Sequence, residues 1–312
     1  MKNYKSVYDE SPFYAIFKAL TVPSLRTITL RCVKSILYNF FFRQFRAAFL
    51  PGRVPVSLVE DPLDQKIPFV PSWVNFYLDF VFFWIRILSF LFHNFKRRSF
   101  DYVRDFIVSI GKLYAFAADS YKKNFSTTKR PFYIKRPRFF LIHMVDPHLM
   151  CIPSLHIMLV IFTYTRFRKI LRSLNQEETH TEQIEELQCG AIAITHAVLY
   201  VKQHSINCIA AALYAMTCFD KELFPVQEAE KFTALLFQES GGYKGAGKKK
   251  IANYKVRPEA APKTKISAED AAQIRAHILN LYYRFMEEGK EAKNWEEPLL
   301  NFMRQMPSIN YP

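Results

Sequence analysis

Two apolar stretches in the second half of the chain each carry a histidine in a short polar island at one end. The first island ends at His156, which is followed by the apolar run 157–162. The second is the triplet 202–204, which lies between the apolar runs 191–201 and 209–216. A polar or titratable side chain in apolar surroundings costs free energy unless it has a partner. We therefore predict that His156 and His204 belong to one site.

The lengths of the two stretches predict that these histidines meet. The polar segment 173–188 separates them. His156 lies 16 residues before Arg172, and His204 lies 16 residues after Gln188, the last residue of the segment. Each arm would be ~24 Å long as a helix, so an antiparallel hairpin brings both histidines to one level. Basic residues cluster at the loop end of the first arm, and cytoplasmic loops are enriched in such residues. The histidines are therefore expected at the opposite, non-cytoplasmic end.

Composition narrows the classes of partner. The 312 residues include 30 Phe and 17 Tyr, and only 8 Gly, which argues against a glycine-rich nucleotide fold. The formal charge of +15 indicates an anionic partner: a phospholipid surface, a phosphorylated substrate or a nucleic acid. The cysteines have no paired spacing and are expected as reduced, mostly buried thiols. The first five residues contain no apolar signal core, which predicts no cleavable signal peptide.

The first half of the chain contains three expected helices. Residues 24–50 mix five Arg or Lys with Ile, Leu and Phe, as in an interfacial helix on anionic lipid or in a basic face of a globular helix. Residues 51–71 hold five prolines and are expected as a loop. The most apolar segment, 72–94, contains Asp79 and Arg86, so it could cross a membrane only with these charges facing the protein interior. A third helix is expected over 100–123, and 124–153 as irregular chain.

The C-terminal part has the pattern of a soluble tail. A short amphipathic helix is expected over 227–239 and a Gly/Lys/Pro linker over 240–262. Ser267 and Asp270 form a capping-box pattern. Behind them one helical stripe is apolar: Ile274, Ile278, Leu281 and Phe285. We therefore predict an all-α, membrane-embedded helical bundle with three regions: an amphipathic or interfacial region (1–71), a helical core (72–220) and a soluble, cytoplasmic helical tail (221–312).

A basic segment precedes the first histidine island. It contains two overlapping Lys-x6-Arg-Pro patterns, from Lys123 to Arg130-Pro131 and from Lys129 to Arg136-Pro137. Together with Pro153-Ser154-Leu155-His156 and the later His204, this order resembles the three motifs of the type 2 phosphatidic acid phosphatase superfamily over roughly residues 70–220. That superfamily includes lipid phosphate phosphatases and lipid phosphotransferases. The third motif differs: Val198 stands at the arginine position and Cys208 at the aspartate position.

The resemblance implies phosphoryl transfer from a lipid phosphate through a phosphohistidine. His204 would attack phosphorus, and His156 would protonate the leaving oxygen. The phosphate-binding set implied is Lys129, Arg136, Lys123, Arg130, Ser154 and Lys202. No metal and no cofactor are implied. The expected partners are a phospholipid or lipid phosphate and a membrane (the inner, cytoplasmic membrane if the protein is bacterial), with no nucleic acid.

Two other functions remain open at this point. Val198 and Cys208 favour a catalytically degenerate relative that binds phospholipid, because a cysteine orients and charges an imidazole poorly compared with a carboxylate. A basic nucleic-acid-binding protein is the second alternative. The basic residues lie at the ends of apolar segments rather than in one stripe with exposed aromatic side chains, which counts against it.

Two further patterns are weaker. Residues 242–248 have P-loop spacing, but Lys249 replaces the magnesium-binding hydroxyl residue and no strand precedes them, so we interpret them as a linker. A group of potential zinc ligands has no common zinc spacing, and its Asp-Pro pair also fits a turn: His143, Asp146, His148, Cys151 and His156. We expect no metal there.

Overall fold

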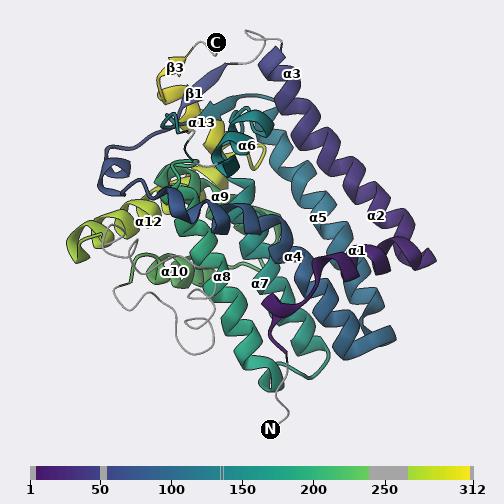
Figure 1. Cartoon of the computed structure of the whole chain (residues 1–312). Coiled ribbons are helices and arrows are strands. Elements are labelled where there is room, and N and C mark those ends of the chain that lie inside the picture. Colours follow the sequence, from purple (N-terminus) through teal and green to yellow (C-terminus); the bar gives the residue numbers. More distant parts are fainter. Residues whose placement is uncertain (1–4, 50–54, 134, 136, 239–265, 310–312) are drawn as a thin grey trace.

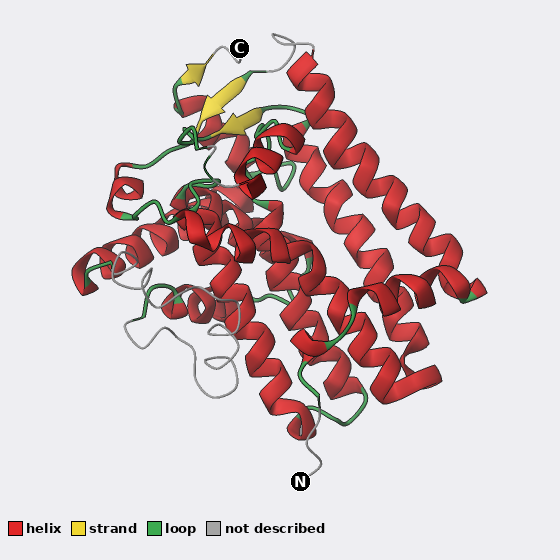
Figure 2. Ribbon diagram, viewed as in Figure 1, coloured by secondary structure: helices red, strands yellow, loops and turns green. Residues whose placement is uncertain are grey.

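The computed structural model describes residues 5–49, 55–133, 135, 137–238 and 266–309, and these are mostly helical (Figures 1 and 2). The N-terminal half contains a 3-10 turn (Val7–Asp9), α1 (Pro12–Thr21), α2 (Pro23–Ile36), a π-helical segment (Leu37–Phe42), α3 (Arg43–Phe49), β1 (Val56–Leu58), two 3-10 turns (Pro62–Lys66 and Pro71–Trp73), α4 (Val74–Phe95), a 3-10 turn (Lys96–Ser99) and α5 (Phe100–Tyr121). The second half contains β2 (Phe125–Thr127), α6 (Pro137–Val145), α7 (Leu155–Ser173), a 3-10 turn (Glu178–His180), α8 (Thr181–Tyr200), α9 (Ile206–Phe219), α10 (Val226–Leu235), α12 (Ala268–Glu291), α13 (Glu297–Gln305) and β3 (Ser308–Ile309). The all-α fold class is therefore confirmed at the level of secondary structure.

The α7–α8 hairpin forms the centre of the molecule. Every residue of α7 from Leu155 to Thr165 is buried, and so is every residue of α8 from Gly190 to Tyr200. Helices that are apolar on all sides need other helices around them. α4 packs on both arms, α9 packs on α7, and α5 contacts α7 from the other side.

The N-terminal helices form an outer layer beside α5. α2 and α5 lie side by side (Figure 1), and the Ser35 hydroxyl donates a hydrogen bond of 2.8 Å to the Gly111 carbonyl. The helix predicted over 24–50 is therefore confirmed, with the π-helical segment inside it. One continuous segment, Pro71–Tyr121, contains a helix long and apolar enough to cross a membrane, and 61% of its most apolar window is buried inside the protein.

The C-terminal tail is packed onto the core instead of forming a separate appendage. α12 lies along α9, and the predicted stripe of Ile274, Ile278, Leu281 and Phe285 is buried. The predicted N-terminal cap is confirmed, because Ser267 accepts a hydrogen bond from the Asp270 backbone N–H (3.0 Å). Burial of an apolar stripe against α9 is the physical reason why the tail does not stand apart.

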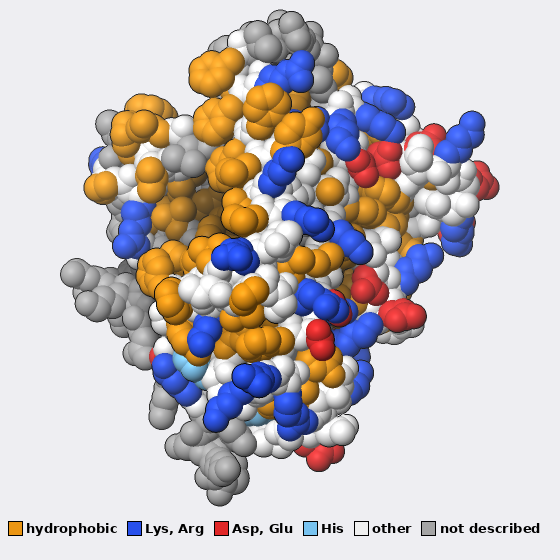
Figure 3. Space-filling model, turned by 90° about the vertical axis from the view of Figure 1, so that its right-hand side faces the viewer, with side chains coloured by type: hydrophobic (Ala, Val, Ile, Leu, Met, Phe, Trp, Pro, Cys, Tyr) orange, Lys and Arg blue, Asp and Glu red, His pale blue; other side chains and the backbone are white. Residues whose placement is uncertain are grey.

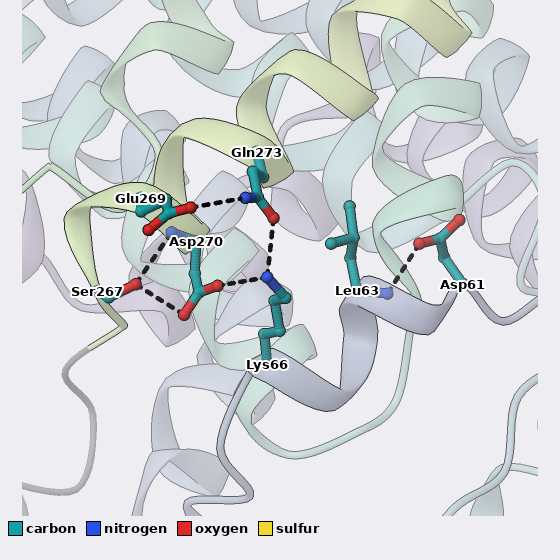
Figure 4. Close-up of polar contacts among 7 residues, drawn as sticks. All are labelled: Asp61, Leu63, Lys66, Ser267, Glu269, Asp270 and Gln273. Carbon is teal, nitrogen blue, oxygen red and sulfur yellow. Dashed lines mark hydrogen bonds and ion pairs between the residues drawn. The ribbon is translucent and has the colours of Figure 1, made fainter.

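The start of α12 also contacts the loop before α4 (Figure 4). Lys66 donates hydrogen bonds to the Asp270 carboxylate (2.6 Å) and to the side-chain amide oxygen of Gln273 (2.8 Å). Asp61 caps the same 3-10 turn by accepting from the Leu63 N–H (2.9 Å). This turn is therefore held to the C-terminal helix.

Short elements interrupt the regions that we expected to be irregular. In a three-stranded sheet, β1 pairs with β2 in parallel and with β3 in antiparallel orientation. α6 forms within 124–153, where we predicted no helix. The three-residue strands β1 and β2 and the nine-residue α6 leave almost no periodic signal in a proline-rich, basic sequence. Tertiary contacts therefore determine whether these short elements form.

Candidate functional site

The two histidines that the sequence singles out are in direct contact. His156 Nδ1 lies 3.2 Å from His204 Nε2, and both side chains are buried. His156 is the second residue of α7, whereas His204 lies in the turn between α8 and α9. The prediction that antiparallel arms bring these residues together is confirmed.

The local chain path explains where His204 lies. The sequence predicts a helical arm that reaches His204, but α8 ends at Tyr200 and α9 begins at Ile206. Lys202 adopts the left-handed conformation (φ 55°), and the N–H groups of Gln203 and His204 both donate to the Val198 carbonyl (2.9 and 3.2 Å). These bonds close the end of α8 in the manner of a helix C-cap. The turn directs the imidazole of His204 back towards the start of α7.

Ser154 completes the contact from the other side. Its Oγ lies 3.2 Å from His204 Nε2, so one imidazole nitrogen faces both a hydroxyl and the His156 ring. The preceding loop is fixed from two directions: Tyr121 donates a hydrogen bond to the Pro153 carbonyl, and Ser126 Oγ accepts from the Ile152 N–H (2.7 Å). The serine and both histidines are therefore held by buried contacts from separate elements.

Arg130 is the basic residue that the structure brings to this site. Its guanidinium donates to the Gln203 side-chain oxygen (3.3 Å) and to the Asp146 carbonyl (3.2 Å). Gln203 directly precedes His204, and the positive charge of Arg130 lowers the pKa of His148, so the guanidinium borders the site at Gln203 and His148. Of the two Lys-x6-Arg-Pro patterns, the one ending at Arg130 therefore supplies the arginine, and Arg136 lies outside the described residues.

Three predicted phosphate ligands lie elsewhere. Lys123 is paired with Glu296 of the C-terminal segment (2.5 Å), and Lys129 lies on the surface near Glu60 (3.9 Å). Lys202 donates to the carbonyls of Asp64 and Ile67 (2.7 and 2.6 Å). The left-handed turn directs this side chain away from the histidines, so we correct its role from a phosphate ligand to an anchor of the turn.

His148 is a third site histidine, which we considered only as a metal ligand. Its ring centroid lies 6.2 Å from that of His204, and its Nε2 is 2.8 Å from Thr128 Oγ1. The Cys151 thiol contacts the same ring at 3.6 Å. The Asp146-Pro147-His148 turn was the available signal, since Asp146 accepts a hydrogen bond from the His148 N–H (2.8 Å).

Burial keeps the site imidazoles neutral. It lowers the pKa of His156 to about 3. Burial lowers the pKa of His204 well below its usual value, and the nearby His156 ring adds to this effect. The pKa of His148 is lowered in the same way by burial, and next by the positive charge of Arg130. An anion between Arg130 and the histidines would stabilise the protonated rings and oppose these shifts.

The two residues that differ from the third motif of the resembled superfamily are fully buried. Val198 has no exposed surface in α8, and Cys208, in the first turn of α9, makes a hydrogen bond with the Cys151 thiol. Neither side chain can act as the arginine or the carboxylate of the resembled motif. Of the three resembled motifs, the first is therefore represented at the site by Arg130 and the second by Ser154 and His156. The third is represented by His204 alone.

The potential zinc ligands are not arranged as a metal site. Within the described part of the chain, no group of three or more His, Cys, Asp or Glu side chains is placed to hold a metal ion. Residues 242–248, with the P-loop spacing, lie outside the described residues. Comparisons with models of known protein families, with curated proteins and with solved structures found no match for this chain. The functional argument therefore depends on the geometry of the histidine site.

Proposed function

We propose that the protein is a membrane-associated phosphatase or phosphotransferase that acts on a lipid phosphate through a phosphohistidine. The observation that carries this proposal is the 3.2 Å contact between two buried histidines from separate segments, with Ser154 on the same nitrogen and Arg130 bonded to Gln203, the residue before His204. Neutral imidazoles beside a guanidinium form a site that favours an oxyanion able to accept hydrogen bonds.

The proposed reaction has two steps. His204 Nε2 attacks phosphorus, a nitrogen–phosphorus bond forms, and the bond from phosphorus to the lipid oxygen breaks while His156 gives that oxygen a proton. Water or another alcohol then attacks the phosphohistidine, and His156 takes back a proton as that oxygen bonds to phosphorus. Burial lowers the pKa of His156 to about 3, and a neighbouring phosphate anion would raise it, so the proton on His156 depends on the bound substrate.

Arg130 and Ser154 would hold the phosphoryl oxygens. The guanidinium donates to the Gln203 side-chain oxygen and to the Asp146 carbonyl, at 3.3 and 3.2 Å. Both acceptors are neutral, so a phosphate oxygen would form a stronger, charge-assisted bond in place of the longer contact. The Ser154 hydroxyl already points to the nitrogen that would bond phosphorus. Both groups would stabilise charge that develops in the transition state.

The lipid substrate and the membrane location belong to the same proposal. The charge of +15 suits an anionic lipid, and the segment Pro71–Tyr121 is apolar enough to enter a membrane. The resemblance would give a membrane-embedded bundle, in the inner membrane if the protein is bacterial, with a cytoplasmic tail. The internal burial of most of that segment's most apolar window favours a bundle that is only partly embedded.

A catalytically inactive phospholipid-binding protein is the second candidate. The specific observation in its favour is that apolar, fully buried side chains occupy both departing positions of the third motif, Val198 and Cys208. Without a carboxylate partner, His204 would be oriented by its turn and by weaker, uncharged contacts with Ser154, His156 and the Cys151 backbone. Binding would then survive while turnover is absent.

The experiment measures phosphate released from phosphatidic acid in detergent by the purified protein. We expect release by the wild type, loss of release in His204→Ala, and no change in Lys123→Ala, which removes a lysine far from the site. Acid-labile labelling of His204 after a brief incubation would identify the phosphohistidine. Full activity of His204→Ala would overturn the mechanism, and no release from any lipid phosphate would favour the second candidate.

A further inference from the structure

Exposed hydrophobic side chains are concentrated on the N-terminal helices. Seventeen large hydrophobic side chains are exposed in the described part of the chain, and ten of these lie between Phe13 and Phe49. Phe13, Phe17 and Phe49 expose 70%, 62% and 78% of their surface. Contiguous exposed apolar surface of this kind marks an interaction site on a folded protein.

A second group of exposed hydrophobic side chains surrounds α6, close to the candidate site. Phe132 is 85% exposed, and Phe140, Leu141 and Met144 expose more than half of their surface. The site loop follows α6 directly. α3 reaches the same loop, because Gln44 accepts a hydrogen bond from the Leu149 N–H (3.1 Å). The two exposed groups therefore flank the loop that carries His148.

The charges on these segments are uniformly positive. Seven Lys or Arg and no Asp or Glu occur from residue 11 to residue 59, and the same is true from residue 122 to residue 145. On α2, the exposed Arg26, Arg31 and Lys34 alternate with the exposed Leu30 and Val33. Figure 3 shows this side of the molecule, where hydrophobic side chains gather among Lys and Arg and a hydrophobic hollow opens at the left. Apolar side chains with interspersed basic groups are typical of helices that lie in a membrane interface.

A basic pocket borders the same helices. It has a volume of about 770 Å³ and is lined by Tyr14 and Lys18 of α1 and by Lys96, Arg97 and Arg98 of the turn after α4. Basic pockets at the membrane-facing side of a protein suit phosphate head groups. The apolar surface thus has a basic, concave neighbour, whereas the acidic Asp101 and Asp105 of the adjacent α5 are paired with Arg104.

We propose that the apolar-basic face, defined as the exposed side chains of residues 13–49 and 132–144, docks into one leaflet of an anionic phospholipid membrane. The apolar side chains enter the acyl region, and the lysines and arginines contact the head groups. α3 and α6 then sit on either side of the site loop, which puts Arg130 at the level of lipid phosphates. This last step rests on the proposed function, whereas the docking itself does not.

Sedimentation of the full-length protein with vesicles tests the docking. We expect tighter binding to vesicles of phosphatidylcholine with phosphatidylglycerol than to phosphatidylcholine alone. Phe13→Ser/Phe17→Ser/Phe42→Ser should weaken binding at least about tenfold. Arg26→Gln/Lys34→Gln should weaken binding to the anionic vesicles alone, by about fivefold per residue. The control is Tyr283→Ser, which removes an exposed aromatic side chain of α12 outside the face.

Two further measurements separate this inference from the proposed function. His204→Ala should bind vesicles like the wild type. The triple phenylalanine variant should retain hydrolysis of a short-chain, water-soluble phosphatidic acid while losing hydrolysis of the long-chain lipid in vesicles. Equal vesicle binding by the triple variant and by Tyr283→Ser would overturn the docking face, as would absence of binding by the wild type. Intact binding without hydrolysis of either substrate would overturn only the proposed function.

Discussion

Mild acid should destabilise this protein because several histidines are buried in the neutral form. Burial lowers the pKa of His156 and of His196 to about 3. It also lowers the pKa values of His148 and His204. In the unfolded chain these residues titrate near their usual value of about 6.5. Their contribution to stability is therefore complete above that pH and is lost as the pH falls.

The size of the effect follows from the proton that the unfolded chain takes up. At about pH 5.5, one unit below the usual value, each histidine that stays neutral in the folded state costs about 1.4 kcal/mol of folding stability. His156 and His196 together therefore cost about 3 kcal/mol, and His148 and His204 add to this. Such a loss is a large part of a typical stability of about 5–15 kcal/mol. Asp64 and Asp146 oppose it, because burial raises their pKa values and the folded state binds their protons more readily.

Denaturant unfolding of the full chain at about pH 7.5 and about pH 5.5 measures this loss. His196→Gln isolates one histidine outside the site, and its amide oxygen can still accept the hydrogen bond from the Phe237 N–H (3.0 Å). Between the two pH values, the free energy of unfolding of this variant should fall by about 1.4 kcal/mol less than that of the wild type. The contributions of the two aspartates are the same in both proteins and cancel in the comparison. An identical pH dependence of the two proteins would refute the reasoning.

Three other predictions test the site and the packing. Arg130→Gln should raise the KM for a lipid phosphate about tenfold or more, since a charged hydrogen bond to phosphate is lost, while Lys123→Gln leaves KM unchanged; steady-state kinetics compare them. Asp64→Ala should lower the free energy of unfolding by about 2 kcal/mol or more, because it leaves the buried N–H of Ile206 without its acceptor, and Asp64→Asn should recover part of the loss in the same denaturant titration. Phe285→Ala should cost about 3–5 kcal/mol by opening a cavity between α12 and α9, and an unfolding midpoint equal to that of the wild type would contradict the tight packing of this helix.

The parts of the fold with strong periodicity could be predicted from the sequence. An antiparallel pair of apolar arms was enough to place His156 against His204, although α8 begins at Thr181, earlier than the expected start of the second arm at Gln188. The serine cap and the apolar stripe were enough to identify α12. The end of α8 could not be predicted, because residues 189–219 are apolar on both sides of the turn. The left-handed conformation of Lys202, the bonds of the next two N–H groups to the Val198 carbonyl and the bond from Lys202 to the 3-10 turn fix that boundary. The same conformation removes Lys202 from the site, so sequence proximity to His204 was a misleading guide to its role.

The C-terminal tail has a physical connection to the candidate site that its sequence does not suggest. α12 holds the turn Pro62–Lys66 through Lys66 and Asp270 (Figure 4). The Asp64 carboxylate of that turn accepts a hydrogen bond from the Ile206 N–H (2.9 Å), and the Asp64 backbone carbonyl accepts one from Lys202. The 3-10 turn therefore contacts the chain both before and after His204. The exposed ion pair of Lys66 contributes little by itself, whereas the buried stripe of α12 supplies most of the stability. Weakening the packing of α12 should therefore loosen the His204 turn before it unfolds the α7–α8 hairpin, which packs mainly on α4, α5 and α9.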